Sequence, residues 1–181
     1  MSRAEPGAAS VAAEALHWRG TVVPGVHLLG DRVDVVVQLA AAEHERRVLA
    51  GERAFIEVKT LTQRLEQEPA FREWPPVQVV GVIARRAQWS SARRVARGYH
   101  AFGPATAVVP PPAAARTLTA IEADYVGVGL VTVDGDEAQV LVPPPAWQAP
   151  TWTWVRRLGE ETIYARMLKL DLGPNAGDSN L

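Results

Sequence analysis

Apolar and polar positions along this chain follow two periods, the two-residue period of strands and the longer period of helices. Apolar or alternating runs predict strands over residues 21–23, 26–29, 33–39, 54–59, 77–84, 105–109, 125–133 and 138–142. Helical spacing predicts helices over residues 8–18, 61–68, 90–102, 113–123 and 151–170, and residues 40–50 are expected to form either a charged helical insert or a long hairpin arm. Strands interleaved with helices predict an α/β domain built on a mixed sheet, with Asp134-Gly135 turning a β-hairpin near its end.

The pattern changes after the hairpin. We expect an α/β domain over residues 1–146 and an extension over 147–181, made of a proline-rich spacer, an amphipathic helix and a disordered end over residues 173–181. Three tryptophans, Trp147, Trp152 and Trp154, mark the extension. They either pack on the domain's own core, which we favour, or form a surface for a second copy or another protein.

Composition narrows the class of protein. The 181 residues are 48% hydrophobic, which is enough for one globular core. The sequence lacks an apolar stretch near 18 residues and its first ten residues do not resemble a secretory signal, so we expect no membrane partner and a cytoplasmic location. With no cysteine, disulfides and thiolate metal sites are excluded.

Charge is unevenly distributed. The formal net charge is −1, yet residues 74–121 contain six arginines and no acid. Such a segment attracts anionic partners such as DNA, unless its arginines pair with acids from elsewhere in the fold; both interpretations stand. The first assigns nucleic-acid contacts to Arg85, Arg86, Trp89, Arg93, Arg94 and Arg97, with Trp89 stacking on a base. The second makes this a solvated helix face, with Trp89 closing the core.

The candidate chemistry lies on two predicted strands. Lys59 is one of only two lysines, beside seventeen arginines, and it follows Glu57 by two residues. On a strand the two side chains would share one face. An earlier apolar run carries Asp34. Two carboxylates on adjacent strands can hold a hard metal ion, and a lysine beside them can orient a water. Short matches of this kind also arise by chance, and a Glu-Lys pair is common on a wet strand face.

These residues, together with the order of the elements, resemble the PD-(D/E)xK restriction-endonuclease-like superfamily. The match rests on Asp34 and on Glu57-Val58-Lys59, and it extends to Tyr99 and to Gly127-Val128-Gly129-Leu130. The resemblance implies a restriction-endonuclease-like mixed sheet flanked by helices. It also implies a Mg²⁺- or Mn²⁺-dependent endonuclease that cuts DNA in repair or defence. Asp34, Glu57 and a carbonyl near Val58 would then bind the metal, and Lys59 would activate water.

The chain also departs from that pattern. Val33 stands where the motif has proline, 22 residues separate Asp34 from Glu57, and the glutamine expected four residues before Tyr99 is Val95. Glu14 is a possible accessory acid, and Asp31 is a weaker candidate ligand. Two other hypotheses remain: a catalytically inactive nuclease-like module that binds nucleic acid or scaffolds a complex, and a plain interaction domain. Geometry separates them, because carboxylates that share one metal must converge to about 4–5 Å.

Overall fold

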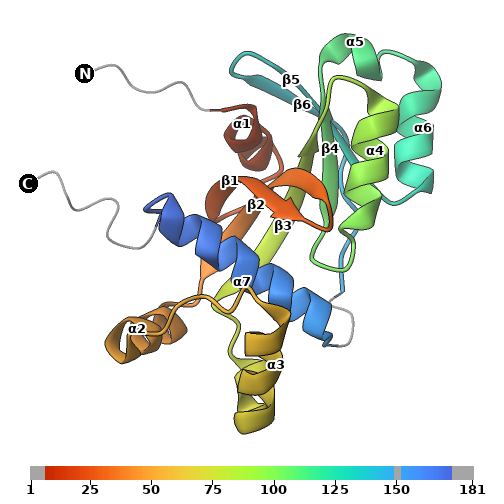
Figure 1. The fold of residues 1–181 in the computed structure, drawn as a ribbon. Helices are drawn as coiled ribbons and strands as arrows, with labels where there is room; N and C mark the ends of the chain where they lie inside the picture. The colour runs from red at the N-terminus through yellow and green to blue at the C-terminus, as the bar shows by residue number, and fades with distance from the viewer. Residues whose placement is uncertain (1–6, 149–151, 173–181) are drawn as a thin grey trace, which may run out of the picture.

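One six-stranded mixed sheet runs through the protein, with its strands in chain order (Figure 1). The computed structural model describes residues 7–148 and 152–172. The strands are β1 (Thr21–Leu28), β2 (Asp31–Leu39), β3 (Val77–Arg85), β4 (Ala105–Val109), β5 (Gly129–Asp134) and β6 (Glu137–Val142). Their pairing is antiparallel from β1 to β3, parallel from β3 to β5, and antiparallel between β5 and β6. The predicted α/β class and terminal hairpin are therefore confirmed.

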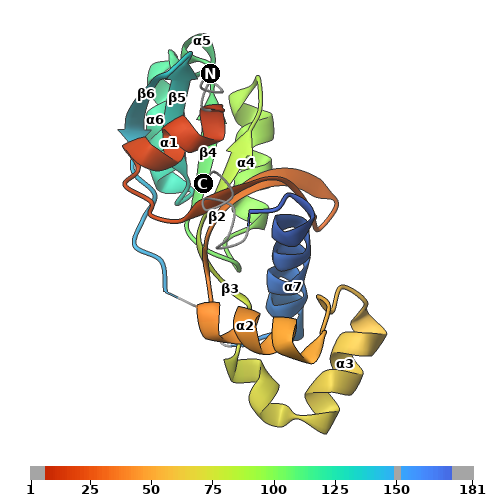
Figure 2. The same ribbon diagram turned by 90° about the vertical axis from the view of Figure 1, so that its left-hand side faces the viewer.

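Helices cover both faces of the sheet (Figure 2). Helix α1 (Ala8–Ala15) packs against β5 and β6 with small buried side chains, Ala9, Ala12 and Ala13. The opposite face carries α4 (Trp89–Gly98), the short α5 (Pro111–Ala114), α6 (Thr117–Tyr125) and α7 (Trp154–Lys169). Helix α4 connects the parallel strands β3 and β4, and α5 with α6 connects β4 and β5, because parallel neighbours need a crossover connection, which is usually helical.

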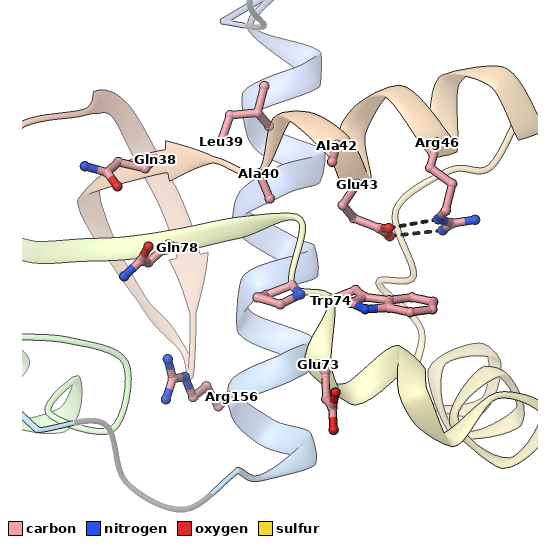
Figure 3. A pocket seen from close by; sticks show the side chains of 11 residues that line it. Gln38, Leu39, Ala40, Ala42, Glu43, Arg46, Glu73, Trp74, Gln78 and Arg156 are labelled. Carbon is pink, nitrogen blue, oxygen red and sulfur yellow. Dashed lines mark hydrogen bonds and ion pairs between the residues drawn. The ribbon is translucent and has the colours of Figure 1, made fainter.

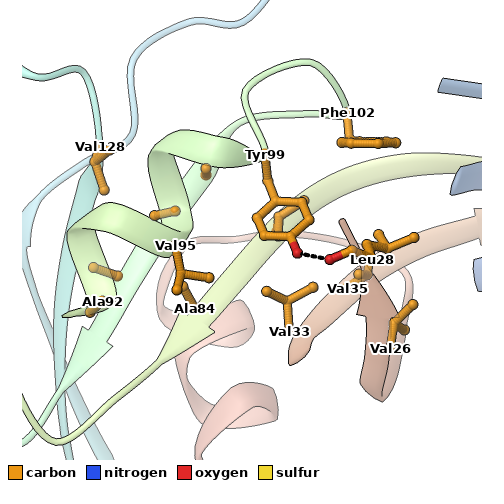
Figure 4. Packing of buried hydrophobic residues seen from close by; sticks show 14 of the residues in the cluster. Val26, Leu28, Val33, Val35, Ala84, Ala92, Val95, Tyr99, Phe102 and Val128 are labelled. Atoms are coloured by element: carbon orange, nitrogen blue, oxygen red, sulfur yellow. Dashed lines mark hydrogen bonds between the residues drawn. The ribbon is translucent and has the colours of Figure 1, made fainter. Parts of the chain in front are cut away.

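The main core lies between the sheet and α4 with α7. Figure 4 shows Ala92 and Val95 of α4 pointing towards Val33 and Ala84 on the strands. These side chains recur at helical spacing on one side of α4, which leaves its arginines to the outer side. Helix α4 ends at Gly98, four residues before the predicted end, and α6 continues to Tyr125, so β5 begins later than predicted.

Residues 40–73 form an arm that holds α2 (Ala41–Ala50), α3 (Val58–Gln67) and a 3₁₀ turn (Pro69–Glu73). Of the two alternatives for residues 40–50, the structure shows the helix, with Gly51 in the left-handed conformation at its end. The strand predicted over residues 54–59 is wrong. Leu61 and Leu65, one helical turn apart, bury against Phe71, and this packing makes the segment helical from Val58 onward.

A buried ion network attaches the arm to α7. Arg47 of α2 donates two hydrogen bonds of 2.7 Å to the carboxylate of Glu161, and its Nε donates to Glu43 at 2.6 Å. Arg47 and Glu161 are both fully buried, and the guanidinium of Arg157 lies 4.1 Å from the ring centroid of Phe71. Removing one partner of a buried ion pair leaves the other charge buried without compensation, which is strongly destabilising. This network therefore holds the arm against α7.

The extension packs on the domain, which was the favoured expectation. Helix α7 lies along β1 and β3, and Ile163, Tyr164 and Met167 enter the main core. Trp152 packs on the Leu61–Phe71 cluster, whereas Trp154 is half exposed. The disorder predicted after residue 173 lies outside the described residues. None of the helices described is long and apolar enough to cross a membrane.

The hairpin between β1 and β2 carries a strained residue. Leu28 pairs with Asp31, so Leu29 and Gly30 form a two-residue turn, and both have positive φ, 47° and 87°. This turn suits Asn-Gly, whereas a leucine in the left-handed conformation is costly. We expect Leu29→Asn to raise the free energy of unfolding by about 1 kcal/mol, measured by thermal and denaturant unfolding.

Leu49→Asn is the matched control for this change, because Leu49 is 89% exposed but lies in the ordinary helical backbone of α2. There the substitution lowers helix propensity and gives no gain. Equal effects of the two substitutions would contradict backbone strain at Leu29.

Candidate functional site

Asp34 is the centre of the candidate site, and its carboxylate is fully engaged. The residue lies in β2 and is 4% exposed. Its Oδ1 accepts a hydrogen bond from the Gly25 amide at 2.9 Å, where β1 bulges, and its Oδ2 accepts one from Nε of Arg85 in β3. A carboxylate held by a backbone amide on one side and a guanidinium on the other is a structural ion pair.

The strand beside Asp34 carries no acid. Asp34 is directly opposite Ile83, so the neighbouring run is Ile83-Ala84-Arg85 of β3. Directly opposed residues share one face of a sheet. Ile83 is fully buried and packs in the cluster that includes the α1 alanines. An isoleucine and an arginine therefore stand where the sequence led us to expect a glutamate and a lysine next to Asp34.

Glu57, Val58 and Lys59 lie on the arm, at the start of α3. Glu57 is an exposed N-cap residue whose carbonyl accepts the Leu61 amide at 2.9 Å, and Lys59 is exposed in the first helical turn. The arm follows the far end of β2 from Asp34. Asp34 and the Glu57–Lys59 pair thus do not lie on adjacent strands, because residues 54–59 form no strand.

The structure also offers these residues no third ligand. Across residues 7–148 and 152–172, no group of three His, Asp or Glu side chains is placed to hold a metal ion. The possible accessory acid Glu14 is exposed on α1. Asp31 faces cations instead, with its carboxylate oxygens 3.5 Å from Arg86 and 3.7 Å from Arg94. The described residues therefore give no physical basis for an Mg²⁺ or Mn²⁺ site at Asp34.

Arginines dominate the surface around Asp34. We define the arginine surface as Arg85, Arg86, Arg94 and Arg97, contributed by the end of β3 and by α4. Three of them share two carboxylates, those of Asp31 and Asp34, and Arg97 has no acidic partner within the described part of the chain. The side chain of Arg94 is 70% exposed. This surface keeps a net positive charge despite its ion pairs.

The other two predicted nucleic-acid contacts, Trp89 and Arg93, are both engaged with Glu122 of α6. Trp89 is only 9% exposed, and its indole Nε1–H donates to Glu122 at 2.7 Å. Arg93 forms an ion pair with the same carboxylate. Trp89 therefore closes the core, as the alternative interpretation held, and is not open to stack on a base. Arg93 is a cross-helix partner of α6.

The sequence alone did not predict Gly25 and Arg85 as the partners of Asp34, although it contains an indication of each. Pro24-Gly25 interrupts an apolar strand, which is where a bulge frees an amide. Arg85 ends an apolar run that otherwise needs no cation. The contact that Tyr99 makes with β1 was also not predicted. Its hydroxyl donates to the carbonyl of Leu28 beside the strained turn (Figure 4). Burial raises the pKa of this phenol.

A separate cavity of about 650 Å³ lies at the other end of β2 and β3 (Figure 3). Gln38, Gln78 and the half-exposed Trp74 line it, and Arg46 donates to Glu43 at 2.8 and 3.0 Å on its wall. Burial alone would raise the pKa of Glu43, but hydrogen bonds from Arg46 and Arg47 outweigh it and hold the pKa below its usual range. Glu43 and Arg46 on this wall therefore already satisfy each other.

Comparison with known proteins adds no relative. The chain matches no family model, and no curated protein or solved structure is similar to it. Function must therefore be argued from the site itself.

The structure predicts that Asp34 stabilises the fold. Asp34→Ala leaves the Gly25 amide and Arg85 without their acceptor, and we expect it to lower the free energy of unfolding by about 2–3 kcal/mol in metal-free buffer. Denaturant unfolding measures this. Asp124→Ala, which removes an exposed acid on α6, is the control and should change little.

A metal-binding Asp34 would behave in the opposite way. Loss of a carboxylate from an acidic cluster relieves repulsion, so an Asp34→Ala protein as stable as the wild type would contradict the ion-pair assignment.

Proposed function

We propose that this protein is a nucleic-acid-binding module with a restriction-endonuclease-like fold that does not cut by a metal-dependent mechanism. The observation that carries the proposal is the register of β2 and β3, which sets Ile83-Ala84-Arg85 beside Asp34. Asp34 is therefore the one acid at a place where a metal site needs two, and the guanidinium of Arg85 holds its carboxylate.

The chemistry of phosphodiester cleavage explains why this register matters. A divalent ion stabilises the charge that develops on phosphate oxygens and lowers the pKa of its bound water. Such an ion needs several oxygen ligands, usually from more than one carboxylate. Ile83 supplies none, and Arg85 takes the position nearest Asp34 with a permanent positive charge. A cation at that place suits contact with a phosphate directly, without a metal between them.

The order of the elements supports the nuclease-like part of the proposal. A helix precedes three antiparallel strands with the acid on the second, and strand–helix units follow on the same sheet. Strands β2 and β6 run against the other four. The resemblance drawn from the sequence implied this kind of mixed sheet, although it placed the third strand at residues 54–59 instead of 77–85.

The arginine surface supports the nucleic-acid part. Its cations outnumber the acids they contact, and they come from a segment of 48 residues that contains no acid at all. Phosphate contacts of this kind supply most non-specific affinity for nucleic acid. The runner-up proposal, a metal-dependent DNA endonuclease that uses Asp34, Glu57 and Lys59, requires the arm to move to Asp34 and Arg85 to leave it.

The test combines binding and cutting in one preparation. We expect the protein to bind duplex DNA with salt-dependent affinity and to leave supercoiled DNA intact in Mg²⁺ or Mn²⁺. Replacing Arg94 and Arg97 by alanine should lower the slope of log affinity against log salt by about 0.9 for each lost phosphate contact. Fluorescence anisotropy across a salt series measures the slope.

The control is Arg53→Ala, an exposed arginine on the arm and far from the arginine surface in the chain. It should leave the slope unchanged. Metal-dependent cleavage that Lys59→Ala abolishes would restore the endonuclease proposal. Absence of DNA binding would remove the nucleic-acid function altogether.

A further inference from the structure

Helix α6 carries apolar side chains on two opposite sides. On its inner side Ala123 is fully buried in the main core and Ala120 packs against that core. On its outer side Leu118, Ile121 and Tyr125 are 72%, 62% and 88% exposed. These three residues follow one another at intervals of three and four, so they lie along one side of the helix. We call them the α6 stripe.

A helix that is apolar on both sides is normally packed on both sides. The sheet is the inner partner, since α6 contacts β5 and β6. Among the residues that the structure describes, nothing covers the outer side, and α6 lies at the margin of the molecule beside α4 (Figure 1). Three large apolar side chains in one continuous stripe differ from singly scattered exposed residues, and they indicate an interaction surface.

The α6 stripe is self-complementary about its middle residue. Leu118 precedes Ile121 by three residues, and Tyr125 follows it by four. If two α6 helices pack antiparallel about a two-fold axis at Ile121, this residue meets its own copy, and Leu118 of each helix meets Tyr125 of the other. Both copies then bury the whole stripe with a single symmetric contact.

The exposed charges at the two ends of α6 fit the same symmetry. Arg116 is the N-cap residue and Asp124 lies in the last turn, and neither forms an ion pair within the described part of the chain. The remaining acid of this helix, Glu122, already accepts from Trp89 and pairs with Arg93. An antiparallel pair brings the cation of each copy to the acid of the other, whereas a parallel pair would set like charges together.

We propose that α6 is the contact surface of a symmetric homodimer, in which the α6 stripe of one copy packs antiparallel on the α6 stripe of a second copy. The apolar contacts supply the affinity. The pairs between Arg116 and Asp124 lie at the exposed ends of the contact, so they contribute little affinity and set the orientation.

The size of the surface sets the strength of this dimer. The nine residues of α6 span about 13 Å, which gives an interface smaller than the roughly 800 Å² per partner of a stable complex. The dimer therefore dissociates reversibly in the micromolar range. It does not rest on the proposed function, although it would bring two arginine surfaces into one assembly, because α4 lies beside α6.

Sedimentation equilibrium of the full chain over a concentration series tests the dimer. We expect the wild type to show a reversible monomer–dimer equilibrium and Ile121→Gln to raise the dissociation constant about tenfold, because one substitution at the axis removes an apolar contact from both copies. Ile121 is exposed and glutamine favours a helix at least as well as isoleucine, so the variant monomer should stay folded. Thermal unfolding at low concentration checks this.

Charge reversal tests the antiparallel arrangement separately. Arg116→Glu and Asp124→Arg each set like charges together at both ends of the contact, and each should weaken the dimer about fivefold. The double variant restores opposite charges and should dimerise as the wild type does. A double variant as weak as the sum of the two single changes would overturn the antiparallel contact.

Leu49→Gln on the arm and Trp154→Gln on the extension are the controls, because both side chains are exposed apolar groups outside α6. They should leave the dissociation constant unchanged. Loss of the dimer in a control, with Ile121→Gln unaffected, would place the interface there and overturn the proposal. A wild type that stays monomeric at every concentration would also overturn it, and a monomer that Ile121→Gln destabilises would assign the α6 stripe to another part of the chain.

Discussion

One carboxylate ties three neighbouring strands together. Asp34 of β2 accepts the amide of Gly25 where β1 bulges and the guanidinium of Arg85 where β3 ends. The bulge, the strained turn at Leu29 and the clamp from Tyr99 all lie at this end of the sheet. Because this carboxylate is the acid at the centre of the candidate site, its commitment to Arg85 decides which chemistry this face can perform.

Local pattern predicted most of the fold, because most elements bury an apolar face that can be read from spacing. The run 77–84 became β3, and the stripe of Ala92, Val95 and Tyr99 became the buried side of α4. The strand predicted over residues 54–59 was wrong because a short apolar segment is compatible with both the strand period and the helix period. Its outcome depended on Phe71, a residue twelve positions away that receives Leu61 and Leu65.

The candidate site was less predictable than the fold, because ion-pair partners come from distant parts of the chain. Asp34 could be identified as unusual from its apolar neighbours, whereas the pairing with Arg85 depends on the register of β2 and β3. The same holds for Arg47 and Glu161, which are 114 residues apart and both fully buried. Periodicity predicts which face of a helix or strand is buried. It predicts neither the order of the strands nor which distant residues form an ion pair.

A double-mutant cycle on Asp34 and Arg85 tests the central claim most directly. The free energies of unfolding of the wild type, Asp34→Asn, Arg85→Gln and the double variant are compared in metal-free buffer, and then with Mn²⁺. The ion-pair account predicts a coupling energy of about 1–2 kcal/mol, moderated because the Arg85 side chain is 47% exposed, and no stabilisation by Mn²⁺ that depends on Asp34. Additive effects, together with Mn²⁺ stabilisation that Asp34→Asn removes, would contradict it.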